Sequence, residues 1–143
     1  MNFEDLENLK LETLISRHRS RFDLRYSKES DIKGVECDSS DPADGRMVKD
    51  EFVSWVFITF EDREQNISQV ILTGVRSDGY TGTSPVINYN REQGWVVTQS
   101  GSLYMLNGPA GEVPADISRV MFIAGLFNMW GIGQVLGMPP VYF

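Results

Sequence analysis

The stretch from Ser84 to Gly108 reads SPVINYNREQGWVVTQSGSLYMLNG and is the part of the chain that decides the fold. It contains three short runs rich in β-branched and aromatic residues, VINY, WVVT and LYML, separated by polar turns. Such runs are typical of antiparallel strands joined by tight turns. Gly94 and Gly101 lie where a tight turn needs a positive φ, which other residues adopt only at a cost. The stretch therefore predicts a three-stranded antiparallel meander.

Two further strands are predicted before this meander. Residues 52–60, FVSWVFITF, are apolar on both alternating faces, which favours a central strand covered on both sides. Residues 67–76, ISQVILTGVR, predict its partner strand. A sixth strand is indicated only at residues 32–37. These lie inside the Asp- and Ser-rich segment 27–51, which otherwise predicts a long polar loop.

Helices are predicted at both ends of the chain. Residues 3–18 place apolar side chains at helical spacing, with acids in the first turns and basic residues in the last. Residues 114–143 open with a helix-starting proline and aspartate and carry no charge after Arg119. We therefore expect one α+β domain over residues 1–143. A mainly antiparallel sheet of five to six strands within 52–108 carries an N-terminal amphipathic helix and an apolar C-terminal helix packed on it.

The composition is that of a soluble globular protein. A chain of 143 residues can bury a core without metals or disulfides, and 41% apolar residues exceed what a disordered chain contains. The formal net charge of −7, with 13 basic and 20 acidic residues, disfavours non-specific nucleic-acid binding. Cys37 is the only cysteine, which excludes an intrachain disulfide and suits a reducing compartment. Because the N-terminus is acidic and unlike a secretory signal, we expect a cytoplasmic protein.

The uncharged segment after Arg119 has two interpretations. Val120 to Met138 is about long enough to span a bilayer. Against a span stand Asn128, Gln134, four glycines and the lack of flanking basic residues beyond Arg119. We expect a buried helix and no membrane span. An apolar tail of this length also predicts a surface for a homodimer or another partner.

Residues 17–25, RHRSRFDLR, contain Arg17, Arg19, Arg21 and Arg25. If the helix continued, Arg17, Arg21 and Arg25 would share one face, spaced to contact several phosphates or carboxylates. The segment is either a patch that binds an anion, a nucleic acid or an acidic partner, or a helix end that pairs with the protein's own acids. The second interpretation is favoured, because no other basic cluster extends a nucleic-acid footprint. We expect no specific nucleic-acid partner.

Two loops are further candidates for partner contact. Asp38, Asp41 and Asp44 lie in the polar loop. Their spacing of three differs from the spacing of two that opens an EF-hand calcium loop, so no metal site is predicted. Tyr80 lies at the tip of a predicted loop at residues 77–85. Long loops are often functional, and exposed aromatic side chains contribute strongly to binding energy once a partner buries them.

The sequence contains no familiar catalytic motif. The fingerprints of nucleotide binding, zinc proteases and serine hydrolases are absent. His18 and Cys37 would form a nucleophile–base pair only if the fold brought them together. The acids Glu61, Asp62 and Glu64 belong to a turn and are expected to be solvated. We assign no catalytic residue, cofactor or metal, and a small hydrolase or transferase that uses dispersed carboxylates stays open as an alternative.

The hairpin WVVTQSGSLYMLNG resembles a T-x-S-x-x-x-Y-x-L pattern of small phage and prophage proteins, where it closes a compact β-rich domain. The matching positions are Thr98, Ser100, Tyr104 and Leu106, with Gly108 displaced by one place, about a tenth of the chain. The resemblance implies an accessory protein that acts by binding, for instance as an inhibitor of a host defence complex. We therefore expect a soluble protein-binding module with a protein partner. A toxin-neutralising immunity protein is a second binding alternative.

Overall fold

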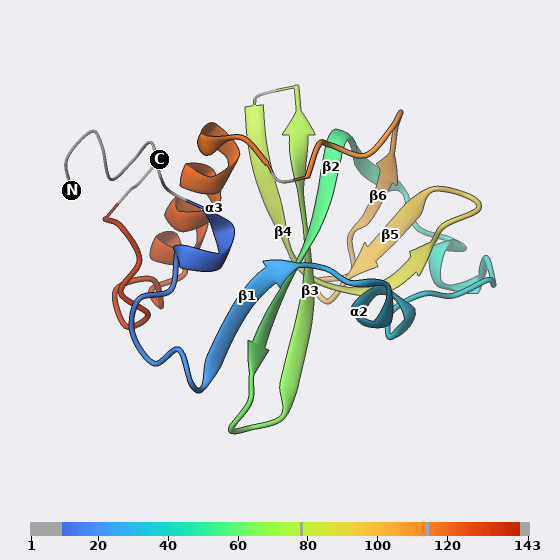
Figure 1. The fold of residues 1–143 in the computed structure, drawn as a ribbon. Helices are drawn as coiled ribbons and strands as arrows, with labels where there is room; N and C mark the ends of the chain where they lie inside the picture. The colour runs from blue at the N-terminus through green and yellow to red at the C-terminus, as the bar shows by residue number, and fades with distance from the viewer. Residues whose placement is uncertain (1–9, 78, 114, 141–143) are drawn as a thin grey trace.

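The computed structural model describes residues 10–77, 79–113 and 115–140. Within them the chain forms six β-strands and two α-helices, which confirms the predicted α+β class (Figure 1). The strands are β1 (Phe22–Tyr26), β2 (Val48–Asp62), β3 (Ile67–Arg76), β4 (Gly79–Asn90), β5 (Trp95–Thr98) and β6 (Leu103–Leu106). The helices are α2 (Glu29–Lys33) and α3 (Ile117–Met129), with 3-10 helices η1 (Leu11–Thr13) and η2 (Asp41–Ala43).

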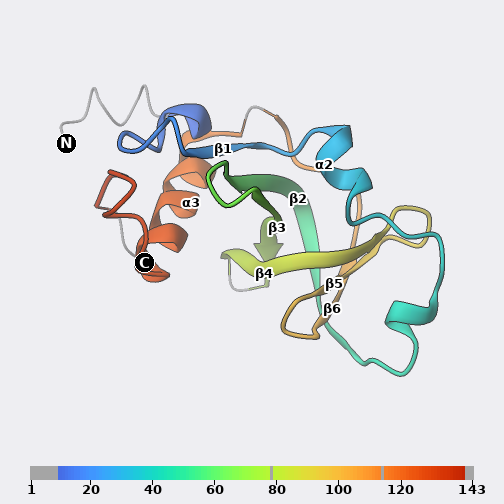
Figure 2. The same ribbon diagram turned by 90° about the horizontal axis from the view of Figure 1, so that it is seen from below.

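The strands form one mixed sheet in the order β1-β2-β3-β4-β5-β6. Neighbours in this order are antiparallel, whereas β2 also pairs with β6 in parallel, with Phe52 opposite Leu106. The strands from β2 to β6 therefore form a ring. Five strands that alternate in direction can close a ring only when the first and last run parallel. Figure 2 shows β5 and β6 at the end of the molecule away from α3.

The long strand β2 belongs to both halves of this sheet because it bends. Its first residues pair with β6 and its later residues pair with β3 and β1. The register with β3 shifts between Val53 and Val56, and Ser54 at the bend has a φ of 48°. A positive φ is uncommon for a residue other than glycine. The bend redirects β2 from the ring toward the part of the sheet that carries α3.

The predicted meander is confirmed. β4, β5 and β6 follow one another as antiparallel neighbours, and Gly94 and Gly101 have φ values of 72° and 88°. The predicted loop at residues 77–85 is wrong, because β4 already begins at Gly79 and pairs there with β3. At Gly82 a Cβ atom would collide with the side chain of Leu126. This glycine therefore marks the close approach of α3 to the strand, and not a loop.

The N-terminal helix is not present in the described part of its predicted range. Residues 3–9 of that range lie outside the described residues. Over residues 10–18 the chain forms only η1 and then turns, with a φ of 60° at His18. The backbone N–H of Arg17 donates to the carbonyl of Leu136, 3.0 Å away. The apolar side chains Leu11, Leu14 and Ile15 are buried, as the spacing predicts. They are buried by contacts with distant parts of the chain, which a 3-10 turn allows as well as a helix does.

The first strand, β1, is not among the predicted strands, and it forms where the arginine segment 17–25 ends. β1 pairs with β2, with Leu24 opposite Phe60. Leu24 is buried, while its neighbours Asp23 and Arg25 are half-buried. This is the alternation of a strand at the border of a core. The sheet is therefore wider than the predicted range of 52–108.

The predicted polar loop at residues 27–51 contains more regular structure than expected. It includes α2, η2 and the first residues of β2. The predicted strand at residues 32–37 is not formed. In its place Glu36 forms a single parallel bridge to Tyr89 of β4. The loop packs Cys37 and Ala43 against the buried side chains of Trp95, Val97 and Leu103. It is thus a cover for the outer face of β5 and β6.

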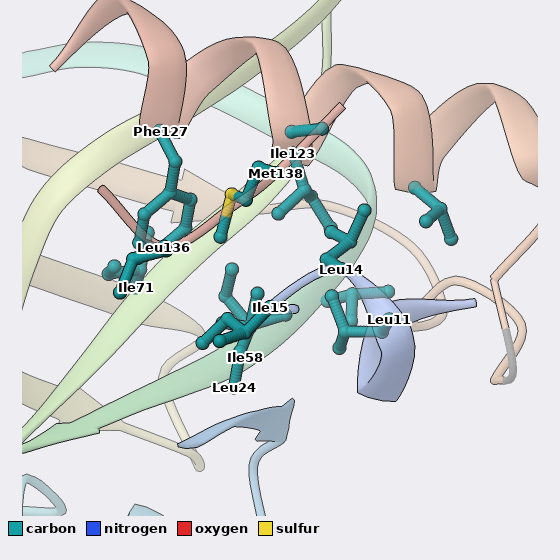
Figure 3. Packing of buried hydrophobic residues seen from close by; sticks show 13 residues of the cluster. Leu11, Leu14, Ile15, Leu24, Ile58, Ile71, Ile123, Phe127, Leu136 and Met138 are labelled. Atoms are coloured by element: carbon teal, nitrogen blue, oxygen red, sulfur yellow. The ribbon is translucent and has the colours of Figure 1, made fainter. Parts of the chain in front are cut away.

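Two apolar cores lie on opposite faces of the sheet. The first lies between the sheet, α3 and the N-terminal segment; Figure 3 shows Ile123 and Phe127 of α3 facing Ile15 and Ile71. The second fills the ring and is formed by Phe52, Phe57, Val70, Leu72, Val86, Tyr89, Val96 and Tyr104. Phe57 belongs to the second core and Ile58 to the first, which confirms that β2 is covered on both faces. Among the described residues no helix is both long and apolar enough to cross a membrane.

Candidate functional site

Arg25 lies at the centre of a network of ion pairs within the protein. Its guanidinium contacts carboxylate oxygens of Asp23 and Asp31, each at 2.7 Å, and of Glu61 at 2.8 Å. The contact with Asp31 is bidentate, with a second bond from Nε at 3.1 Å. Such paired contacts are the strongest geometry available to an arginine and a carboxylate. The charge of Arg25 is therefore directed at the protein's own acids.

The other three arginines of the segment divide into one paired and two exposed side chains. Arg21 makes a bidentate contact with Asp62, at 2.9 and 3.0 Å. Arg17 and Arg19 are exposed, and no side-chain partner is found for them among the described residues. The four side chains do not form one helical face, because the chain turns at His18 and continues as β1. Their role in partner binding stays a prediction.

The acidic residues of the polar loop are separate from this network. Asp38, Asp41 and Asp44 are all exposed, in and beside η2. Within the described ranges no group of three or more His, Cys, Asp or Glu side chains is placed to hold a metal ion. The three acids belong to the loop that covers β5 and β6, and they stay predictions as contact residues.

The ion pairs lower the pKa of several carboxyl groups. Hydrogen bonds from Arg25 hold the pKa of Asp31 below its usual value, and hydrogen bonds from Arg21 do the same for the pKa of Asp62. A proton would have to displace these bonds before the carboxylate could accept it. Hydrogen bonds from Arg91 lower the pKa of Glu29, whereas the pKa of Asp50 is lowered first by the backbone N–H of Glu51 and then by Arg76.

We expect the protein to lose stability in acid. A carboxyl group whose pKa is lowered by folding contributes stability above its unfolded pKa, about 4, and loses that contribution as the pH falls through its folded pKa. The free energy of unfolding, measured by urea titration, should therefore decline from about pH 5 to about pH 3. The decline should be shallower in Asp31→Asn, which removes one such group. Stability that stays level or rises over this interval would contradict the prediction.

A pocket of about 600 Å³ opens between the bend of β2, the loop after β6 and the start of α3. Val53 and Ser54 come from the bend, and Tyr80 comes from the start of β4. The lining is Val53, Ser54, Tyr80, Asn107, Gly108, Pro109, Ala110, Gly111, Glu112, Ala115, Asp116 and Arg119. We call this cavity the Arg119 pocket. Of the residues predicted for partner contact, Tyr80 alone lies in it.

Arg119 is the unusual residue of the pocket, because it is buried without a counter-ion. Its residue surface is 5% exposed, and it forms no ion pair among the described residues. Nη2 donates to Ser54 Oγ at 2.9 Å, whereas Nη1 is buried with no hydrogen-bond partner in the described structure. The guanidinium carbon lies 5.2 Å from the ring centre of Tyr80. An uncompensated buried charge is costly for a folded protein.

Local structure explains how Arg119 reaches this position. Asp116 caps α3 by accepting the Arg119 backbone N–H at 2.9 Å, which fixes the first turn of the helix. Gly111 brings the loop against β2, with its N–H donating to the Trp55 carbonyl at 2.9 Å. A Cβ atom at Gly111 would lie 2.8 Å from the Ser54 carbonyl oxygen. A glycine is therefore required where the loop closes over the bend.

Four exposed apolar side chains either line the pocket or belong to residues next to its lining in sequence. Val53 and Tyr80 belong to its lining, and Val113 and Ile117 are next in sequence to lining residues. We call these four residues the apolar rim. The ring of Tyr80 also contacts that of Phe122, with 5.9 Å between centres. A second exposed group, the C-terminal apolar surface, consists of Met129, Trp130, Ile132 and Val135.

Sequence reasoning selected Tyr80 as a contact residue, which stays a prediction, and did not select Arg119. The available signal was that Arg119 is the only charged residue of α3, in the segment ISRVMFIAGLFNM. A single charged residue in a mainly apolar helix lies either at the exposed edge of the helix or in a buried position that has a structural or functional role. Its burial could be recognised only once β2 and the loop after β6 were placed beside it.

Comparison with known proteins gives no relative from which a function could be transferred. No protein-family model, curated protein or solved structure matches the chain. Function is therefore argued from the geometry of the described residues.

Proposed function

We propose that the protein is a protein-binding module and that the Arg119 pocket and its apolar rim are its contact surface. The observation that carries this proposal is the buried guanidinium of Arg119, which lacks an ion pair in the described structure and lines one pocket with the exposed apolar side chains of Val53 and Tyr80. Arginine and tyrosine are enriched among the residues that dominate binding energy, provided a partner removes them from water. Arg119 and Tyr80 meet in this pocket.

A binding function is better supported than a catalytic function that uses the carboxyl groups. Among the described residues, the carboxyl groups with a displaced pKa are Asp31, Asp62, Glu29 and Asp50, and in each of them the pKa is lowered. A carboxylic acid that donates a proton at neutral pH needs a raised pKa. A hydrolase or transferase built on dispersed carboxylates is therefore the weaker proposal. That the partner belongs to a host defence complex is proposed from the resemblance of the Thr98–Leu106 hairpin, and a toxin is the alternative.

Two matched valine substitutions test the surface. Val113 in the rim and Val135 in the C-terminal apolar surface are 58% and 57% exposed, so a glutamate at either position should have little effect on folding. Tagged wild-type protein and the two variants would be used to capture partners from bacterial lysate, with quantification by mass spectrometry. We expect Val113→Glu to reduce capture of the main partner roughly tenfold or more, and Val135→Glu to retain it.

The reverse pattern would move the contact surface to the other end of α3. In that case the C-terminal apolar surface would be the binding site. The solution mass of wild type and of Val135→Glu would then show whether it joins two copies of the chain. Equal capture by both variants would contradict the assignment of the surface to the Arg119 pocket.

A further inference from the structure

Arg119 has no ion pair in the described structure, whereas five other arginines do. Arg21, Arg25, Arg76 and Arg91 each contact a carboxylate within 3.0 Å, and Arg63 contacts Glu61 at 3.4 Å. All five are more exposed than Arg119. Arg119 is the one arginine in the buried class, yet it has no such contact in the described structure. The residue with the greatest need of a counter-charge is thus the one without it.

We infer that the Arg119 pocket binds a single carboxylate group of the partner polypeptide, between Arg119 Nη1 and the Ser54 hydroxyl. This inference rests on the proposed function and names the chemistry of the group that the partner contributes. Nη1 is a donor without an acceptor. The Ser54 hydroxyl accepts from Nη2 and keeps its own proton for donation. Two donors from residues that line one cavity match the two oxygens of a carboxylate.

The charge of the lining favours a monoanion over a phosphate. Glu112 and Asp116 also line the pocket, and Arg119 is the one basic residue among its lining. The Asp116 carboxylate is directed to the Arg119 backbone N–H, which leaves its negative charge close to the cavity. Glu112 and Asp116 repel any anion in the pocket, and only Arg119 attracts it. A phosphate dianion is repelled about twice as strongly as a carboxylate, because it carries twice the charge. The chain as a whole has a net charge of −7, which adds to the same preference.

The ring of Tyr80 covers the guanidinium and has to be exchanged for the ligand. It lies over the guanidinium carbon at 5.2 Å and is itself partly exposed to solvent. The ring gives the guanidinium a cation–π contact but leaves Nη1 without an acceptor, whereas a carboxylate gives Nη1 a charge-assisted hydrogen bond. A carboxylate that enters the pocket therefore supplies the bond that the ring cannot, and the Tyr80 ring can pack on the stem of the incoming chain.

Titration of the full chain with small probes tests this inference. The probes are N-acetylglycine, which carries a chain-end carboxylate, N-acetylglutamic acid α-amide, which carries a side-chain carboxylate, N-acetylglutamine amide, which is neutral, and inorganic phosphate. The readouts are the NMR signals of the Arg119 side-chain Nε–H and of the Trp55 indole N–H, which donates to the Gly108 carbonyl at 3.3 Å. We expect at least one carboxylate to bind roughly tenfold or more tightly than the amide and phosphate. The ratio of the two carboxylates identifies the source.

Variants connect the binding to the named donors. Arg119→Met should weaken the carboxylate roughly tenfold or more, and Ser54→Ala, which keeps the charge, should weaken it by a smaller factor. Arg76→Met is the matched control, since Arg76 pairs with Asp50 outside this cavity and should leave the dissociation constant unchanged. If Arg119→Met fails to fold, Ser54→Ala and Arg119→Lys carry the test.

Several results would overturn the inference. Tighter binding of phosphate, equal binding of the neutral amide, or carboxylate binding that survives Arg119→Met would each show that the pocket does not select a carboxylate through Arg119. If no probe binds and Arg119→Met still captures the partner while Val113→Glu does not, the inference fails and the proposed function stands. If carboxylates bind through Arg119 but Val113→Glu captures the partner normally, the carboxylate site stands and the proposed function fails.

Discussion

Replacing Phe127 by alanine is expected to lower the free energy of unfolding by about 3–5 kcal/mol, the range for a large aromatic side chain removed from a core. Phe127 is fully buried in the core between α3 and the sheet. Its ring contacts those of Phe60 and Trp130, with centres 5.3 and 5.2 Å apart. The substitution therefore removes contacts that link the helix to β2 and leaves a cavity. Urea unfolding monitored by circular dichroism would measure the change.

The same helix supplies the control for this prediction. Met129 is two residues further along α3 and is 62% exposed. Met129→Ala should change the free energy of unfolding by no more than about 0.5 kcal/mol, because surface substitutions remove few contacts. A loss below about 1 kcal/mol in Phe127→Ala would show that α3 is not held on the sheet by this core.

Replacing Arg25 by methionine is expected to lower the free energy of unfolding by about 2–3 kcal/mol at neutral pH. Removing one partner of a fully buried ion pair lowers the free energy of unfolding by more than this. The Arg25 side chain is 20% exposed, so solvent screens its charge and the expected loss is smaller. The substitution leaves Asp23, Asp31 and Glu61 close together without their shared cation. Repulsion among the three carboxylates adds to the loss of the hydrogen bonds.

The pH dependence separates this mechanism from simple loss of packing. Arg25 lowers the pKa of Asp31, and the stability that this contributes is lost as the pH falls below about 4, so the difference between Arg25→Met and wild type should shrink. Arg91→Met is the control, because Arg91 is also paired but is about half exposed, and it should have a much smaller effect at neutral pH. A difference that is the same at pH 7 and pH 3 would contradict the electrostatic explanation.

Local sequence predicted the elements whose stabilising contacts are near in the chain. β5 and β6 follow the prediction because turn glycines and alternating β-formers act over a few residues. β1 is not among the predicted strands, since the spacing of four between Arg17, Arg21 and Arg25 is also compatible with a helix face. The alternation that marks a strand was carried by Leu24 alone. The bend of β2 lies at Ser54 and not at a glycine, so the local sequence does not indicate it. The bend accompanies the pairing with β6, which is distant in the chain.

The candidate site shows the same division between local and distant information. Tyr80 was predicted from its neighbourhood of glycines, although the segment is a strand and not a loop. Arg119 could not be predicted, because its burial depends on Ser54 and Gly111, which come from the bend and from the loop after β6. The sequence shows that a residue is charged and that it belongs to a helix. It does not show whether the fold places a carboxylate next to it.

The parallel pairing that closes the ring also bears on how fast the protein folds. β2 and β6 meet across about fifty residues of chain, as in the register of Phe52 and Leu106. Non-local pairings raise the relative contact order, and folding slows because the entropy of closing the intervening loop is lost before the pairing forms. The hairpins β2–β3, β4–β5 and β5–β6 can form first, with ring closure last. Refolding in stopped-flow should therefore take milliseconds to seconds, and a microsecond phase that recovers the full native signal would refute this order.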